Sequence, residues 1–232
     1  GSRQYTIQQL TAHCAQARLD SALESNFASV LLSNRALTVP LRTVTTQVQS
    51  LPDGTTDAQF SLVRALSRLC AVYVNFTWEN APGGGAQYIH AQPVSTFAFP
   101  SDTVPGSGGG INHREHILEM QLQLGSKLYP ENPIDSLGEF YDRLQEAVDT
   151  YDQSLRTLSI TPRMFQLHSF VAGFNLSKVP GAFASGQNTR VGDLLSIRVR
   201  NMIPGMMNIK AYVHLVYEGI LEVRESGVSF YD

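Results

Sequence analysis

Residues 209–224 read IKAYVHLVYEGILEVR, and this stretch decides the fold class. From Ile209 to Val223 the apolar side chains fall mostly on odd positions, while polar side chains such as His214 fall on even positions. This period of two is typical of a β-strand with one buried face. Gly219 interrupts the pattern and predicts a bend or bulge. The chain therefore contains a long, half-buried strand.

The same alternation recurs elsewhere in the chain. It is clear in residues 116–124 and 194–200, and a β-prone run with one apolar face extends from Val72 to Trp78. Residues 37–48 alternate with a slip in phase, and Pro40 predicts an edge position because proline lacks the N–H that a central strand needs. Weaker strand candidates are residues 4–13, 58–65, 87–99, 163–174 and 227–231.

Two segments have the period of a helix instead. A long helix is predicted over residues 136–156, behind a capping box formed by Ser136 and Glu139. A shorter helix is predicted from the N-cap Asp20 to about residue 32. The apolar stripe of the long helix consists of Leu137, Phe140, Tyr141, Leu144, Val148, Tyr151 and Leu155. Many strands, few helices and no βαβ rhythm predict a mainly β fold with antiparallel sheets.

The composition suits one globular domain. Of the 232 residues, 43% are hydrophobic and 16% are charged. We therefore expect a single β-sandwich domain over residues 1–232. Residues 79–114 are rich in Gly and Pro, and they predict a long loop that decorates this sandwich. Gly1 and Ser2 are interpreted as a cloning scar.

Charge and cysteine content exclude several classes of protein. Seventeen Lys and Arg against twenty Asp and Glu give a net charge of −3, which argues against a general nucleic-acid binder. No apolar run reaches the roughly twenty residues of a membrane span, and the first residues lack a signal-peptide pattern. Cys14 and Cys70 are interpreted as buried small hydrophobes, and the sequence leaves open whether they pair.

The histidines do not form a convincing metal or catalytic site. His113 and His116 flank Glu115, but the segment leads into a strand, where the two imidazoles would face opposite sides. His13 lies beside Cys14, and sequence neighbours in a strand point apart and cannot act as base and nucleophile. The remaining histidines, His90, His168 and His214, have no metal-ligand spacing and are expected to be structural or exposed.

Other motifs are equally weak. The glycine clusters at 83–85 and 106–110 lack the residues that complete a phosphate-binding loop. The sequons that begin at Asn75 and Asn175 are interpreted as chance matches. Acidic side chains of the long helix are expected to form a solvated face. The sequence therefore predicts no catalytic, cofactor-binding or metal-binding residues, and it favours a structural or binding role.

A series of motifs nevertheless resembles a known family. The predicted strand 116–124 leads into GSKLYP at 125–130 and then into the long helix, and LTVP stands early in the chain at 37–40. FVAGFNL follows at 170–176, and YVHLVY at 212–217 closes into VRESGV at 223–228. This order resembles one jelly-roll portion of the major capsid proteins of the double jelly-roll lineage of double-stranded DNA viruses, of the Polinton-like and virophage-like kind.

The resemblance implies a fold and a role. The implied fold is an antiparallel jelly-roll β-sandwich with one long and one short helix. The implied role is a structural capsid subunit in the virion, made in the host cell, which self-associates as a homo-oligomer such as a trimeric capsomer. It implies no active site and no cofactor. A double jelly-roll protein is roughly twice as long, so a fragment, a proteolytic core and a single-jelly-roll relative all remain open.

Two other classes of function stay open from the residues alone. One is a β-sandwich module that binds carbohydrate or protein through aromatic side chains such as Tyr73, Trp78 and Tyr88 in a loop-end groove. The other is an enzyme on a cupin-like barrel, in which His113, Glu115 and His116 would bind a metal together with His168 or His214. Glycan binding would indicate the first, and stoichiometric metal would indicate the second.

Overall fold

The computed structural model describes residues 9, 11–52, 55–78, 118–148, 160–179, 182–190, 194–202 and 209–232. Backbone contacts divide the chain into two compact units. The sandwich unit comprises residues 42–219 with Asp232, and the arm unit comprises residues 1–41 and 220–231. A single domain over the whole chain stays a prediction.

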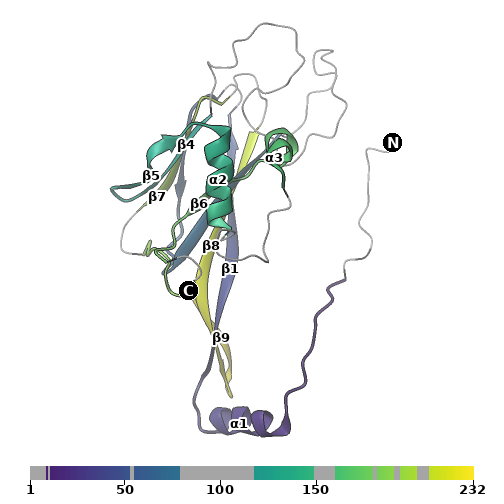
Figure 1. Ribbon diagram of the computed structural model, residues 1–232. Helices are drawn as coiled ribbons and strands as arrows, with labels where there is room; N and C mark the ends of the chain where they lie inside the picture. Colours follow the sequence, from purple (N-terminus) through teal and green to yellow (C-terminus); the bar gives the residue numbers. More distant parts are fainter. Residues whose placement is uncertain are drawn as a thin grey trace, which may run out of the picture. The chain divides into compact units, whose positions relative to one another are not determined.

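The strands form two sheets (Figure 1). The first sheet has the order β1-β8-β3-β6, and a ninth strand, β9, pairs with β8. The second sheet has the order β2-β7-β4-β5. The bounds in the first sheet are β1 Leu37–Leu51, β8 Ile209–Arg224, β3 Leu69–Trp78, β6 Ala172–Asn175 and β9 Gly227–Tyr231. Those in the second are β2 Ala58–Leu62, β7 Leu195–Arg200, β4 Glu119–Leu124 and β5 Lys127–Ile134.

The strand pairings are nested. The innermost pair is the hairpin of β4 and β5, and around it β3 pairs with β6, β2 with β7 and β1 with β8. Successive pairs alternate between the two sheets. A long antiparallel ribbon that is folded over in this way is a jelly roll, which closes two sheets over one core. The strand order by itself therefore confirms the predicted jelly-roll β-sandwich.

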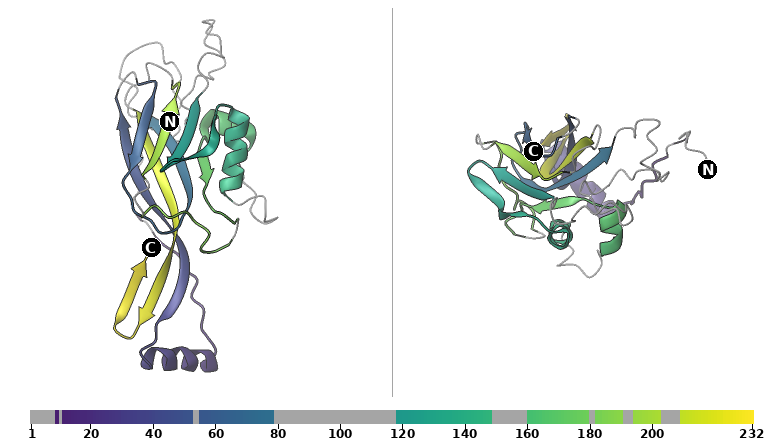
Figure 2. Two further views of the ribbon diagram at one scale, coloured as in Figure 1. Left: turned by 90° about the vertical axis from the view of Figure 1, so that its left-hand side faces the viewer. Right: turned by 90° about the horizontal axis from the view of Figure 1, so that it is seen from above.

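The core lies between the two sheets, and Figure 2 shows the ribbons of these sheets from two further directions. Alternate residues of each strand point into it, as the period of two predicts. The first sheet contributes Val72, Val74, Phe76, Ala211, Val213 and Leu215, and the second contributes Phe60, Met120, Leu122, Leu124, Ile197 and Val199. These side chains are all nearly or fully buried, so the sandwich unit has a continuous apolar interior.

Helix α2, Leu137–Ala147, packs on the outer face of β6. Its N-cap is Ser136, whose hydroxyl accepts a hydrogen bond from the Glu139 amide, as the capping sequence predicts. Gly173 of β6 permits the close approach, because a Cβ there would lie 3.0 Å from the Leu144 Cα and 3.1 Å from the Ala147 Cβ. The short helix α3, Pro162–His168, adds Phe165 to the aromatic contacts beneath α2.

The arm unit contains helix α1, Ser21–Leu32, and the hairpin formed by β9 with residues 220–224 of β8. Asp20 caps the helix, as predicted, by accepting from the Ser21 amide at 2.8 Å. None of the described residues of the arm unit is buried. This unit therefore has no apolar interior of its own in the part of the chain that is described.

Several local expectations were wrong. β5 was not among the predicted strands. It contains Pro130 and Pro133, which an edge strand tolerates. Residues 162–168 form α3 instead of the start of a strand. Thr161 caps that helix and proline stands in its first turn, which is a recognisable helix start. Of the expected strand at 4–13, the described residues 9 and 11–13 are not extended in a sheet.

The long helix is shorter than predicted, and three other predictions are not tested. The long helix ends at Ala147 with Val148 as its C-cap, and Tyr151 and Leu155 lie outside the described residues. The register between β3 and β8 shifts between Leu69 and Ala71, and the bend or bulge at Gly219 stays a prediction. The expected loop 79–114 and the strand candidate 87–99 also lie outside the described residues.

Candidate functional site

Most of the histidines considered for metal binding lie outside the described part of the chain, and the described ones belong to no metal-binding group. His90, His113 and His116 are outside it, as is Glu115. His168 is the last residue of α3 and not part of a strand. Among the described residues no group of three or more His, Cys, Asp or Glu side chains could hold a metal ion.

The two cysteines have different environments and are both free. Cys70 lies in β3 and is buried, as predicted. Cys14 is exposed in the arm unit, so its assignment as a buried hydrophobe was wrong. The reason is that residues 11–20 form no strand and present no face to a core. His13, beside it, is likewise exposed.

His214 lies in a line of hydrogen bonds across three strands. Its Nδ1 is 2.8 Å from the Thr46 hydroxyl of β1, and its Nε2 is 2.8 Å from the Asn75 Oδ1 of β3. An amide oxygen can only accept, so Nε2 carries the proton and Nδ1 accepts from Thr46. Burial lowers the pKa of His214, which favours this neutral form. Asn75 is itself buried, so the sequon that begins there lies within the folded sheet.

This line has the connectivity of a hydroxyl nucleophile, a base and an orienting amide. A hydrolytic centre also needs free N–H donors for an oxyanion. Here the backbone around the three side chains belongs to the sheet ladder, in which Tyr73 is paired with His214 and Asn75 with Tyr212. The arrangement therefore binds β1, β8 and β3 together, and it provides no oxyanion site from β3 or β8.

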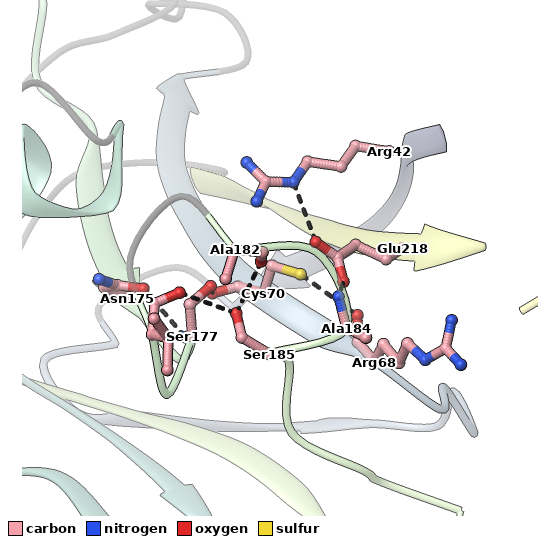
Figure 3. A network of polar contacts seen from close by, with 10 residues as sticks. Arg42, Arg68, Cys70, Asn175, Ser177, Ala182, Ala184, Ser185 and Glu218 are labelled. Carbon is pink, nitrogen blue, oxygen red and sulfur yellow. Dashed lines mark hydrogen bonds and ion pairs between the residues drawn. The ribbon is translucent and has the colours of Figure 1, made fainter. Parts of the chain in front are cut away.

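A fully buried carboxylate, Glu218, forms a second polar centre (Figure 3). Its Oε1 lies 3.2 Å from the Arg42 Nε, and its Oε2 accepts from the Ala184 amide at 2.6 Å. Ion pairing and amide donation together compensate for the removal of this charge from water. Glu218 stands in the polar register of β8, so burial there was not predicted from the sequence.

The loop that follows β6 is held against β3 around this carboxylate. Leu69 and Gln187 exchange two backbone hydrogen bonds of 2.8 Å each. At Gly186 a Cβ would lie 2.6 Å from the Arg68 carbonyl carbon, so only glycine fits there. Ala184 has a φ of 66°, a conformation that is unfavourable for alanine and is held by its bond to Glu218. The Glu218 centre therefore fixes the course of this loop.

Cys70 lies in the same cluster. Its thiol donates to the Arg68 carbonyl oxygen at 3.4 Å. Burial, reinforced by the negative charge of Glu218, raises the pKa of the Cys70 thiol to about 11. A reactive cysteine needs a lowered pKa and access to solvent, and Cys70 has neither. The cluster is a structural centre and not a nucleophilic one.

The aromatic groove considered for ligand binding does not include Tyr73. The Tyr73 hydroxyl donates to the Ala147 carbonyl oxygen at the end of α2, at 2.8 Å. Tyr73 therefore anchors the helix on the first sheet. The Trp78 side chain and Tyr88 lie outside the described residues. Among the residues that the structure describes, no helix is both long enough and apolar enough to cross a membrane.

Exposed apolar side chains distinguish this molecule more clearly than any polar cluster. In the arm unit they are Leu19, Leu23, Phe27, Leu32, Val39, Val228, Phe230 and Tyr231. In the sandwich unit they are Val44, Val48, Val63, Leu128, Met164, Val179, Phe183 and Leu194. Large exposed apolar side chains that gather on one region mark an interaction surface. The exposed apolar side chains of the two units are therefore the candidate contact residues.

No protein-family model and no curated protein matches the chain. Solved structures of viral capsids do match it. The PBCV-1 virus capsid aligns at 10% identity with a TM-score of 0.49, covering 91% of this chain and 54% of that chain. The Sputnik virophage aligns at 12% identity with a TM-score of 0.40, covering 84% of this chain and 38% of that chain.

The mavirus major capsid protein aligns at 10% identity with a TM-score of 0.40, covering 85% of this chain and 41% of that chain. Identities this low concern the fold alone. The chain spans about half the length of the PBCV-1 chain that it matches, at 54%. The chain aligns with part of several viral capsid proteins, and its own strand order establishes the jelly roll.

Proposed function

We propose that this chain is a structural subunit of a viral capsid that self-assembles into a shell through lateral contacts between jelly rolls. The proposal places the protein in the virion after synthesis in the host cell. It includes homo-oligomerisation, with a trimeric capsomer as the expected form, and contacts with other capsid subunits. It includes no catalytic activity, cofactor, metal or direct contact with nucleic acid. The jelly-roll strand order and the sequence motifs support it.

The observation that carries the proposal is the apolar character of the sheet edges. Edge strand β1 exposes 57% of Val44 and 48% of Val48. Val63, which directly follows edge strand β2, is 84% exposed, and Leu128 of edge strand β5 is 42% exposed. Three of the four sheet edges therefore carry large apolar side chains in contact with water, which favours association along the edges.

The fourth edge differs. β6 has α2 packed on its outer face, and α2 also contacts α3. On β5, Pro130 and Pro133 remove two backbone donors, so strand addition by main-chain pairing is disfavoured there. Contacts at β5 are therefore expected to use side chains. Side-chain contacts between the edges of rigid sandwiches suit a shell in which each subunit keeps its fold.

Light scattering coupled to size exclusion, with electron microscopy of the same samples, tests the proposal. We expect the mass of the wild-type chain to rise with concentration, and we expect Val44→Asp, in edge strand β1, to suppress that rise. Val179→Asp is the matched control, because Val179 is also exposed, at 55%, but lies outside the edge strands. A wild-type chain that stays monomeric at all concentrations and salt conditions would contradict the proposed function.

A further inference from the structure

We propose that helix α1 of one copy packs onto the β8–β9 hairpin of a second copy. The inference rests on the proposed function, in which copies of the chain adjoin one another. The two surfaces are the α1 stripe, formed by Leu23, Phe27 and Val30, and the hairpin face, formed by Leu221, Val223, Val228 and Phe230.

The α1 stripe follows the helical period. Leu23, Phe27 and Val30 are spaced by four and three residues, so their side chains share one side of the helix, and Leu19 directly precedes the N-cap Asp20. Leu19 is 46% exposed, Leu23 is 43% and Phe27 is 38%. None of the helix residues is buried. An isolated helix of twelve residues is marginal in water and needs an apolar surface to pack on.

The hairpin face is defined by the strand register. Leu221 is paired with Phe230 and Val223 with Val228, so all four side chains project from the same face. Val228 is 64% exposed and Phe230 is 43% exposed. The opposite face carries Glu222 and Arg224, whose charges pair with each other at 3.0 Å. The apolar face therefore presents no charge to an approaching helix.

The end of α1 indicates that the partner comes from another copy. The Arg35 amide donates to the Val30 carbonyl oxygen and the Asn34 amide to that of Leu31, while Asn34 has a φ of 59°. This is a Schellman motif, which fixes how the chain leaves the helix toward β1. Folding α1 back onto its own hairpin would require a different turn. With this turn intact, Leu23 and Phe27 of the helix and Val228 of the hairpin remain exposed in the arm unit.

The two surfaces agree in length. Twelve helical residues extend about 18 Å, at about 1.5 Å per residue. The five paired residues of β9 extend about 17 Å, at about 3.4 Å per residue. One helix can therefore cover the hairpin face from end to end. Identical copies can exchange an element when one chain carries both an apolar helix stripe and an apolar surface that fits it. The arm unit has this arrangement.

Disulfide trapping in the full chain tests the contact directly. In a Cys14→Ser background, we expect Leu23→Cys and Val228→Cys chains, mixed and oxidised, to give a covalent dimer. Leu32→Cys mixed with Val228→Cys is the control, because Leu32 lies on the opposite side of α1 and is 75% exposed. A dimer that is equally abundant with Leu32→Cys would overturn the proposal, as would a Leu23→Cys/Val228→Cys double variant that crosslinks only within one chain.

Mixing of association-defective variants gives a second readout. Phe27→Asp removes the helix surface and Val228→Asp the hairpin surface, and each is expected to weaken association at least about tenfold. Their mixture keeps one intact helix and one intact hairpin, so it should associate more tightly than either variant alone. Circular dichroism checks that both variants fold.

The outcomes separate the inference from the proposed function. If wild type and Phe27→Asp assemble equally well, the exchange of α1 is wrong and the capsid proposal stands. If wild type never associates, the proposed function itself is contradicted.

Discussion

Arg42 and Glu218 form an ion pair of 3.2 Å in which the carboxylate is fully buried and the arginine side chain is 37% exposed. Arg42 is therefore the solvent-facing half of a pair whose other half cannot reach water. Removal of Arg42 would leave a buried charge held mainly by the Ala184 amide.

We expect Arg42→Ala to lower the free energy of unfolding by about 2–3 kcal/mol, because the buried carboxylate loses a charged partner. Urea denaturation followed by circular dichroism measures the change. Arg200→Ala is the control, since Arg200 is half exposed and 4.0 Å from Glu119. The control should change stability by less than about 1 kcal/mol. Equal effects in the two variants would show that the Glu218 centre does not stabilise the fold.

Gly173→Ala tests the seating of α2 on the sheet. The new Cβ would lie 3.0 Å from the Leu144 Cα, a backbone atom that can move only with the helix. We expect a loss of about 1–3 kcal/mol from overpacking, measured by thermal and urea unfolding. Gly138→Ala is the control, because no atom lies within 4 Å of a Cβ there and alanine favours the helix. A Gly173→Ala variant as stable as the Gly138→Ala variant would contradict the packing of α2 on β6.

The pH dependence of stability tests the environment of His214. Burial lowers its pKa in the folded chain below the ordinary histidine value of about 6.5. As the pH falls through about 6.5, the unfolded chain binds a proton at this position more readily than the folded chain does. The free energy of unfolding therefore falls with pH in this window, and the decline from this group ends once folded His214 is also protonated.

We expect His214→Gln to flatten this dependence between about pH 7 and 5.5. The measurement is a series of urea titrations at fixed ionic strength. An unaltered slope in His214→Gln would mean that the hydrogen bonds to Thr46 and Asn75 do not depend on the neutral imidazole.

The two thiols should differ in reactivity. Cys14 is exposed, whereas burial raises the pKa of Cys70 to about 11. At pH 8 a thiol reagent should therefore modify one cysteine in the folded chain and the second only after denaturation. A Cys14→Ser variant should show no fast reaction. Rapid modification of Cys70 in this variant would show that the loop next to Glu218 opens readily.

The sequence predicted the elements that have a strong period of their own. Residues 209–224 and 195–200 are strands because their alternation matches one buried face, and Asp20 and Ser136 cap the expected helices. β5 escaped prediction, because its two prolines argue against a strand unless its edge position is already known.

The polar centres could not be predicted in the same way. Glu218 follows the polar register of β8, and its burial depends on a loop that is distant in the sequence. His214 gains its role only from the lateral order of β1, β8 and β3. Local patterns determine which face of a strand is apolar, whereas these contacts depend on which strands become neighbours.

The nested strand pairing also sets an order of folding events. Among the nested pairs, β4 and β5 are neighbours both in sequence and in the sheet, whereas β1 pairs with β8 across most of the described chain. Closing larger loops costs more entropy, so the inner hairpin is expected to form first and each outer pair later. During synthesis β1 leaves the ribosome long before β8 exists. Its apolar edge must therefore remain unpaired in the nascent chain, and in this interval the chain is most exposed to aggregation and to chaperones.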